Sequence, residues 1–345
     1  MSLIQTYAVW NNKGGVGKST ITFHLASRYA ELNPDTNVLV IDLCPQSNSS
    51  MMVLGGGTSG ESTAFDLCQQ ASPRTVVGYL AQVIGAGPGA SLPDPMQWLL
   101  KVNDYNDKVA DNLYLLCGDG NLEPMAPLIA ERASQPPLTA ASDPWRWVHL
   151  VVKGFIESLV KKDGDKNWMV FVDTNPSFSI YTEIAVCGAS RLIVPVNADD
   201  SSRVAVNAMF TLLHGSNPPH PVYGRYTFAE KAKERKLAIP QVHLIVGNRL
   251  TVYEGPAKAF KAMSDATAEA LYFAWQHNPS RFSPPSKKVQ NLKSFRNAFA
   301  KPLRDFNTAG VVAAHRGTPM SRLKDGRYPV HGDKIRVNKR DLRGC

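Results

Sequence analysis

Short, continuous apolar runs recur along the chain, and several of them end in a polar residue. The runs cover residues 7–10, 37–42, 112–116, 168–173, 191–196 and 242–249. Such runs are typical of strands buried on both faces of a parallel sheet. Segments between them have apolar residues at helical spacing, as in 21–30, 147–160 and 256–277. The pattern predicts an α/β fold, a doubly wound and mainly parallel sheet flanked by helices, with its chemistry at the carboxyl ends of the strands.

A glycine-rich turn follows the first run and ends in Lys18, Ser19 and Thr20, where a helix is expected to begin. Glycines let backbone N–H groups converge on phosphate oxygens, and the N-terminus of a helix adds partial positive charge. Lys18 would then reach the β- and γ-phosphates of a nucleotide, and the Ser19 hydroxyl would be a Mg²⁺ ligand. The sequence therefore predicts a phosphate-binding loop.

The loop departs from the standard pattern G-x-x-x-x-G-K-[ST], because Asn12 stands where the first glycine would be. It resembles instead the deviant Walker A motif of the ParA/MinD family of P-loop ATPases, K-G-G-x-G-K-[ST]-[ST]. The matching fixed positions are Lys13, Gly14, Gly15, Gly17, Lys18, Ser19 and Thr20, and Val16 fills the variable one.

This resemblance implies a P-loop NTPase fold with ATP and Mg²⁺ as cofactors, and residues 14–20 as the nucleotide-binding loop. It also implies that Lys13 crosses an ATP-sandwich homodimer to contact the nucleotide of the other subunit. Lys13 and Lys18 would stabilise the charge that develops on the phosphates during hydrolysis.

Asp42 ends the second apolar run, where the family pattern reads D-x-D-P-Q. Pro45 and Gln46 match that pattern, whereas Cys44 replaces the second Asp. The resemblance makes Asp42 the catalytic residue that positions or polarises the attacking water. A strand-end Asp that only caps a turn is the alternative, and the preceding loop favours the catalytic role.

Asp173 ends the run at 168–173, at the Walker B position, where the resemblance implies a Mg²⁺ ligand. Asn175 departs from the small residue or proline common in the family. Asn248 ends the run at 242–249 and matches the position that contacts adenine; closing the strand into a turn is its alternative role. Asp199 and Asp200 are expected to cap the helix that begins near residue 201.

The net charge of +9 is concentrated near the C-terminus. Residues 287–345 carry 15 Lys and Arg against 4 Asp and Glu, whereas residues 1–286 carry 23 and 25. This asymmetry indicates a polyanionic partner. Phe295, Phe299 and Phe306 lie among the basic residues and are expected to pack on the core. We expect residues 1–286 to form the ATPase domain and residues 287–345 a basic segment packed on it or extending it.

The stretch from about residue 55 to 110 fits this pattern less well. It holds a plausible helix within 62–82, preceded by a flexible loop at 55–57. Because 131 residues separate Asp42 from Asp173, we interpret part of 55–110 as an insertion. It would be a mobile lid, a partner surface or a tolerated loop.

The chain lacks an 18-residue apolar run and a signal-peptide pattern at its N-terminus. Its five cysteines are scattered without C-x-x-C spacing, which argues against a zinc site or a redox pair and is typical of reduced, intracellular thiols. The expected location is therefore the cytoplasm, with association to the nucleoid in the ATP state.

The resemblance covers most of residues 3–260 by the order of the motifs. It implies a dimerising ATPase that binds double-stranded DNA nonspecifically and positions a plasmid, a chromosome or another cargo. A ParB-like or other adaptor protein would stimulate its slow hydrolysis. No membrane partner is expected.

Three alternatives remain open. A MinD-like membrane switch would need an amphipathic C-terminal helix, and the last twenty residues have few large apolar side chains. Lys13 and the Asp42 motif argue against a small-molecule kinase or ligase. Cys44 and Asn175 are compatible with a module that holds ATP without hydrolysing it.

Overall fold

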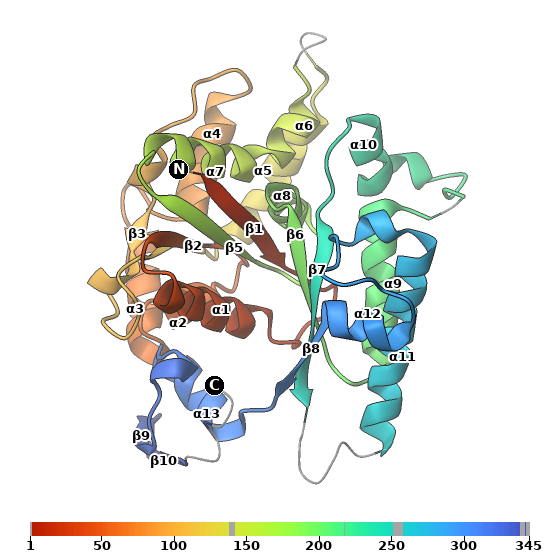
Figure 1. Cartoon of the computed structure of the whole chain (residues 1–345). Helices are drawn as coiled ribbons and strands as arrows, with labels where there is room; N and C mark the ends of the chain where they lie inside the picture. The colour runs from red at the N-terminus through yellow and green to blue at the C-terminus, as the bar shows by residue number, and fades with distance from the viewer. Residues whose placement is uncertain (1, 138–141, 217, 251–257, 339–341, 343–345) are drawn as a thin grey trace.

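An eight-stranded sheet forms the centre of the computed structural model, which describes residues 2–137, 142–216, 218–250, 258–338 and 342 (Figure 1). The strands are β1 Leu3–Val9, β2 Thr36–Leu43, β3 Leu100–Lys101, β4 Leu113–Leu116, β5 Asn167–Thr174, β6 Arg191–Val196, β7 Gln241–Leu250 and β8 Ala300–Arg304. They lie in the order β3-β4-β2-β5-β1-β6-β7-β8, and all neighbours pair in parallel except the short edge strand β3. The predicted doubly wound, mainly parallel sheet is confirmed.

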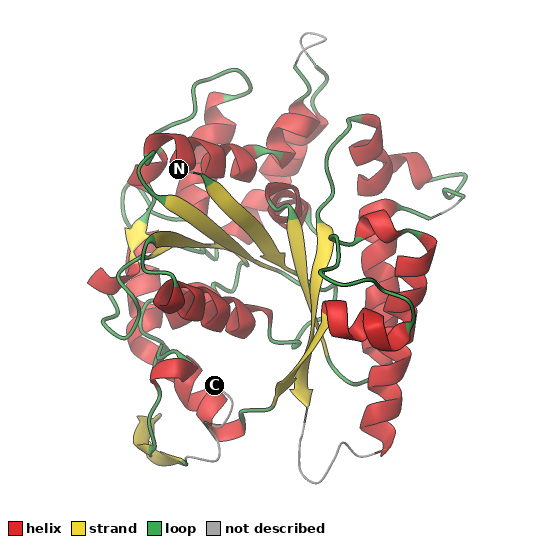
Figure 2. Cartoon of the chain, in the orientation of Figure 1, coloured by secondary structure: helices red, strands yellow, loops and turns green. Residues whose placement is uncertain are grey.

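Helices cover both faces of the sheet, as Figure 2 shows. Alternate residues of each central strand supply the two hydrophobic layers: Leu39 and Ile41 of β2 face one layer, Val38 and Val40 the other. One layer packs against α1 Lys18–Leu32, α2 Asn48–Val53 and α3 Gly57–Cys68. The other packs against α4 Val76–Ala86, α5 Leu122–Ser134, α6 Pro144–His149, α7 Val151–Lys162, α8 Ile180–Gly188, α9 Asp200–His214, α10 Phe228–Glu234, α11 Lys258–His277 and α12 Leu292–Phe299.

Two helices predicted as continuous are interrupted. The helix expected within 62–82 is two helices, because Thr75 begins α4 by accepting a hydrogen bond from the Gly78 backbone N–H at 3.2 Å. The helix expected over 147–160 breaks at Leu150, between α6 and α7. The start of the helix predicted at 256 lies outside the described residues.

The loop predicted at 55–57 is also shorter than expected, since α3 begins at Gly57. Gly56 has a φ of +72°, and a Cβ there would lie 2.3 Å from the backbone nitrogen of Gly317. Glycine is thus needed here both for the backbone conformation and for a close approach of the C-terminal chain.

The C-terminal chain first extends the sheet and then crosses to the α1 face. Phe295 and Phe299 of α12 are buried in the core, as expected. After β8 come α13 Asn307–His315 and an unpredicted antiparallel hairpin of β9 Gly326–Val330 and β10 Asp333–Val337. Figure 1 shows this blue segment beside the red helices α1 and α2. None of the described helices combines the length and apolar character that crossing a membrane requires.

Candidate nucleotide-binding site

The predicted phosphate-binding loop connects β1 to α1 at the carboxyl edge of the sheet. Gly15 and Gly17 have φ values of +70° and +84°, the left-handed region that favours glycine. A Cβ on Gly17 would lie 2.4 Å from the amide nitrogen of Asn248, so this position is also closed to a side chain by packing. The Asn11 amide donates to the carbonyl oxygen of Pro195 at 2.6 Å, which fixes the loop against β6.

A cavity of about 630 Å³ lies over this loop. Its walls include six residues of the predicted nucleotide-binding loop: Gly14, Gly15, Gly17, Lys18, Ser19 and Thr20. Val16 is buried beneath the loop instead. A cavity of this size falls in the range of small-molecule and cofactor sites.

The Lys18 ammonium group donates to the backbone carbonyl of Lys13 at 2.9 Å and lies 3.5 Å from that of Asn11. Burial lowers the pKa of Lys18, and the nearby Asp173 carboxyl partly offsets this effect. A largely buried ammonium group that is held by two backbone carbonyls in the cavity wall is suited to an anionic ligand.

Two carboxyl groups lie side by side under the loop. Asp42 and Asp173 are opposite each other in the register of β2 and β5, and both side chains are fully buried. Burial raises the pKa of each, and the Asp42 charge further raises that of Asp173. The sheet thus places two acids where adjacent parallel strands end.

Asp42 has a full set of hydrogen-bond donors. It accepts from the Cys44 backbone N–H at 3.1 Å, and from the Ser50 backbone N–H and hydroxyl at 2.9 and 2.7 Å. Ser50 in turn accepts from the Gly118 backbone N–H at 2.8 Å, which ties Asp42 to the end of β4. The Asp42 carboxyl is therefore rigidly oriented.

The Asp173 carboxyl has fewer hydrogen-bond partners than that of Asp42. Its Oδ1 is 3.4 Å from the Thr22 hydroxyl, whereas its buried Oδ2 has no hydrogen-bond partner among the described residues. The Ser19 hydroxyl also interacts with this carboxyl and lowers its pKa. A hard cation could be coordinated by this buried carboxylate oxygen, which lacks a hydrogen-bond donor, and by the neighbouring hydroxyl. Ser19 and Asp173 therefore fit Mg²⁺.

The Lys13 side chain points away from the Asp42 and Asp173 carboxyls, toward the start of α9. Its ammonium group forms an ion pair with Asp199 and lies 3.4 Å from the Ser202 hydroxyl. Asp199 also caps α9, as predicted, by accepting from the Ser202 backbone N–H at 2.8 Å. Partial burial favours the neutral acid, but the bonds from Lys13, Ser202 and Ser201 outweigh it and lower the pKa of Asp199 to about 2.

Asn248 lies behind the loop. Its amide group donates to the carbonyl oxygen of Val16 at 2.9 Å, and its side chain is not among the walls of the main cavity. A second cavity of about 260 Å³ opens next to it, between the ends of β6, β7 and β8; Asn197, Gly247 and Pro302 are among its walls.

The two departures from the family pattern have local explanations. Cys44 is buried in the cavity wall, where burial and the Asp42 and Asp173 charges raise the pKa of its thiol to about 12. It therefore contributes no charge. The Asn175 amide donates to the Tyr181 hydroxyl at 3.2 Å, and its side-chain oxygen accepts from the Ser177 backbone N–H, so it stabilises a turn.

Sequence reasoning missed three residues of the site. Ser50 holds Asp42, Asp199 holds Lys13, and His331 of the C-terminal hairpin lines the main cavity. Asp199 and His331 are distant from the loop in sequence, so no local pattern relates them to it. Ser50 lies in the run Ser47–Ser50 after Asp42, and that run was the one available signal.

Comparisons with known proteins agree with this fold. A family model described as an AAA domain matches residues 4–84. The structure of apo McdA from Cyanothece is similar, with a TM-score of 0.58 and 14% identity over 93% of this chain and 92% of that one. The ATP complex of a McdA variant from Cyanothece gives a TM-score of 0.57 and 14% identity over 93% and 90%. No curated protein matches the sequence.

The fold and the loop define a P-loop nucleotide-binding protein. Within that class the loop Lys13–Thr20 has the pattern that resembles the deviant Walker A motif of ParA/MinD-type ATPases, and the AAA-domain match over residues 4–84 and the fold shared with McdA agree with that resemblance.

Proposed function

We propose that the protein is a ParA-type ATPase that dimerises around ATP, binds DNA nonspecifically in that state, and positions a plasmid, a chromosome or another cargo. The observation that carries this proposal is the complete loop Lys13–Thr20, folded between β1 and α1 above the Asp42 and Asp173 carboxyls. This geometry matches the needs of phosphoryl transfer, which depends on positioning and on charge stabilisation.

In this proposal the phosphates of ATP occupy the main cavity. The backbone N–H groups of Gly14 to Thr20 and the Lys18 ammonium bind the phosphate oxygens, and the second cavity beside Asn248 takes the adenine. Ser19 and Asp173 would hold Mg²⁺, which would supply positive charge to the phosphates. Asp42, fixed by Ser50, orients and polarises the attacking water.

Lys13 leaves Asp199 and contacts the phosphates of the other subunit when the dimer closes. The Lys13–Asp199 pair is partly exposed, with side chains 20% and 42% accessible. Such pairs contribute only about 0–1 kcal/mol, so the exchange of an Asp199 partner for a phosphate is inexpensive. A lysine held this loosely suits a switch.

The basic C-terminal segment supports nucleic acid as the partner. In the described part of that segment the chain forms a sheet strand, short helices and a hairpin packed on the body, rather than a free amphipathic helix. This arrangement favours DNA over the membrane surface of a MinD-like switch. An adaptor protein would stimulate hydrolysis and release the DNA.

Binding to duplex DNA with ATP, with ADP and without nucleotide tests the proposal, in the wild type and in Asp42→Ala. We expect binding that requires ATP and persists in Asp42→Ala, because that variant keeps the loop and loses the water-positioning carboxylate. Binding should weaken steeply with salt. Absence of DNA binding in every nucleotide state would exclude the DNA switch, and anionic liposomes would then separate the membrane alternative.

A further inference from the structure

The C-terminal hairpin presents a basic face to the surface. Side chains alternate along a β-ribbon, and on the inner side Tyr328, Ile335 and Val337 pack against α13. On the outer side Arg327 lies directly opposite Arg336. With the exposed Lys334, these two residues form what we name the ribbon face.

The ribbon face contributes little to holding the hairpin together. Among the described residues, no hydrogen bond or ion pair involves the side chains of Arg327 and Lys334. The Arg336 guanidinium donates to the Asn338 side-chain oxygen at 3.0 Å and forms a long ion pair with Asp325 at 4.0 Å. Like charges directly opposite each other on a ribbon are destabilising. Asp325 and Asp333 neutralise part of this charge, but the outer side of the two strands carries three cations and no carboxyl group, and this excess indicates an external anion.

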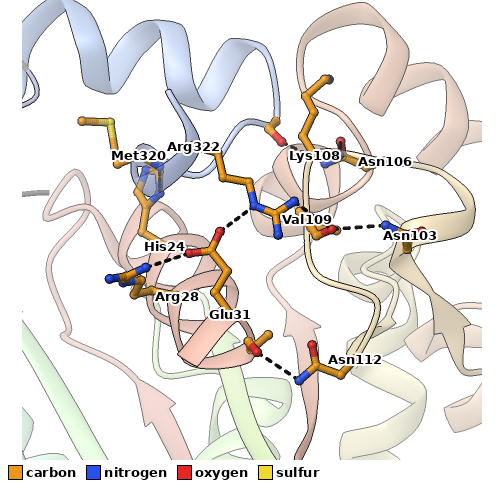
Figure 3. Close-up of polar contacts among 12 residues, drawn as sticks. His24, Arg28, Glu31, Asn103, Asn106, Lys108, Val109, Asn112, Met320 and Arg322 are labelled. Atoms are coloured by element: carbon orange, nitrogen blue, oxygen red, sulfur yellow. Dashed lines mark hydrogen bonds and ion pairs between the residues drawn. The ribbon is translucent and has the colours of Figure 1, made fainter. Parts of the chain in front are cut away.

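The hairpin is rigidly joined to the nucleotide-binding body. Figure 3 shows the Arg322 guanidinium between Glu31 of α1, at 2.8 Å, and the carbonyl oxygen of Val109, at 3.2 Å. In the same contact region, the Met320 backbone N–H donates to the Nδ1 atom of His24, also on α1, at 3.4 Å.

Two further contacts secure the chain just before the hairpin. The Lys108 ammonium donates to the carbonyl oxygen of Arg316 at 2.8 Å, and the Asn106 amide donates to those of Gly317 and Val53. The ribbon face therefore has a fixed orientation relative to α1, the helix that begins with Lys18.

The turn of the hairpin reaches the nucleotide cavity. His331 and Gly332 have φ values of +47° and +93°, as a two-residue hairpin turn requires. His331 lines the main cavity together with Lys18 and Ser19. One end of the ribbon thus forms part of the wall of the cavity that contains the phosphate-binding loop.

We propose that the ribbon face, Arg327, Lys334 and Arg336, contacts the phosphates of duplex DNA. This inference rests on the proposed function and assigns its DNA-binding surface. A two-stranded ribbon fits the major groove of B-form DNA, and its cations would pair with the backbone phosphates on either side. The position of His331 places this surface next to the nucleotide that is to control it.

The test measures ATP-dependent duplex DNA binding by the full chain at several salt concentrations. The variant is Arg327→Gln/Lys334→Gln/Arg336→Gln. We expect it to bind ATP as the wild type does but to bind DNA at least tenfold more weakly. The slope of log affinity against log salt should decrease by about 2 to 3, since each lost phosphate contact removes about 0.9.

Two control variants isolate the position of the charges from their number. Lys161→Gln/Lys166→Gln/Lys233→Gln removes three exposed lysines that precede β5 and β7, at the opposite edge of the sheet, and should leave DNA binding near wild type. Arg327→Lys/Arg336→Lys keeps the charge and should retain most of the affinity, which also shows that the hairpin still folds.

The outcomes separate the two proposals. If the wild type binds DNA and the ribbon variant binds equally well with the same salt slope, the ribbon face is wrong while the DNA switch stands. If the wild type binds no DNA in any state, both are wrong. Loss of binding to phosphatidylserine vesicles without any loss of DNA binding would overturn the assignment in favour of a membrane.

Discussion

The polar groups at the carboxyl edge of the sheet form two unlike sets. Under β2 and β5, the carboxyls of Asp42 and Asp173 are fully buried, and Asp42 accepts three hydrogen bonds. Beside β6, the ion pair of Lys13 and Asp199 is partly open to solvent. Burial and hydrogen bonds hold the two carboxyls in one orientation. The partly exposed ion pair is weak, so its partners can be exchanged at little cost in free energy.

The difference indicates a division of roles within one site. On the proposed function, the groups that meet the reacting phosphate and water in a fixed geometry lie in the interior, where packing orients them. On the same proposal Lys13 moves between subunits, and its ion pair lies where water and a second anion compete for it. Variants of each set should therefore have effects of different size.

The largest effect is expected from Lys18→Ala. This change removes the ammonium group that lies over the loop, and the loss of its charge-assisted bonds to phosphate should weaken ATP binding by about 100-fold or more. Titration with a fluorescent ATP analogue measures it. Lys161→Ala, which removes an exposed lysine before β5, is the matched control. Near-normal ATP affinity in Lys18→Ala would contradict the assignment of the cavity.

Asp42→Asn should come next. It keeps the shape of the side chain and an acceptor for Ser50, but it removes the charge that would polarise water. We expect ATP binding to stay within a few-fold of wild type and hydrolysis to decrease by about 100-fold or more. A steady-state phosphate-release assay, paired with a melting curve to check the fold, measures both. Retained turnover would make Asp42 a structural capping residue.

The sequence predicted the positions of the buried carboxyls but not the partner of Lys13, for a physical reason. A strand buried on both faces needs a continuous apolar run, so Asp42 and Asp173 are marked by the runs that they end. The Lys13–Asp199 pair is a contact between two polar surface positions, and no local pattern encodes it. The fold class followed from the runs for the same reason.

The C-terminal hairpin escaped prediction although its signals are present. The alternation of Tyr328, Val330, Ile335 and Val337 is short, and the turn at His331–Gly332 lacks the common Asn-Gly or Asp-Gly pair. The hairpin packs against α13, and the Arg322 side chain just before it bonds to α1 and to the 102–112 region, which are remote in sequence. A two-stranded ribbon is marginal by itself, so its existence depends on tertiary packing.

His24 is a buried base on α1, and its burial should make the stability of the protein depend on pH. Burial lowers the pKa of His24 to about 4, and its Nδ1 accepts from Met320, so the neutral form is needed in the folded state. The unfolded chain binds the proton at about pH 6.5, so stability falls as the pH drops from 6.5 toward 4. Between pH 7 and pH 5 this group should cost about 2 kcal/mol.

Urea unfolding of wild type and His24→Asn at pH 7 and pH 5 isolates this effect. Asn keeps an acceptor for Met320 and does not titrate, so the variant should lose about 2 kcal/mol less than wild type over that interval. The comparison also cancels the contribution of His214, whose pKa is lowered by burial to about 4 in both proteins. Equal losses would mean that His24 is accessible to protons in the folded state.

The smallest effect is expected from Asp199→Asn. This change keeps a cap for α9 but removes the charge that holds Lys13, so the free energy of unfolding should change by less than about 1 kcal/mol. Freed from its partner, Lys13 is available to a second subunit, and ATP-driven dimerisation should strengthen by up to about fivefold. The pKa of Asp199 is about 2, so the effect should be constant from pH 5 to 8.

Sedimentation with ATP measures the strength of dimerisation. Lys13→Ala is the counterpart variant, which should bind ATP yet fail to hydrolyse it. Weaker dimerisation in Asp199→Asn would show instead that the ion pair orients Lys13 for the partner subunit rather than holding it back.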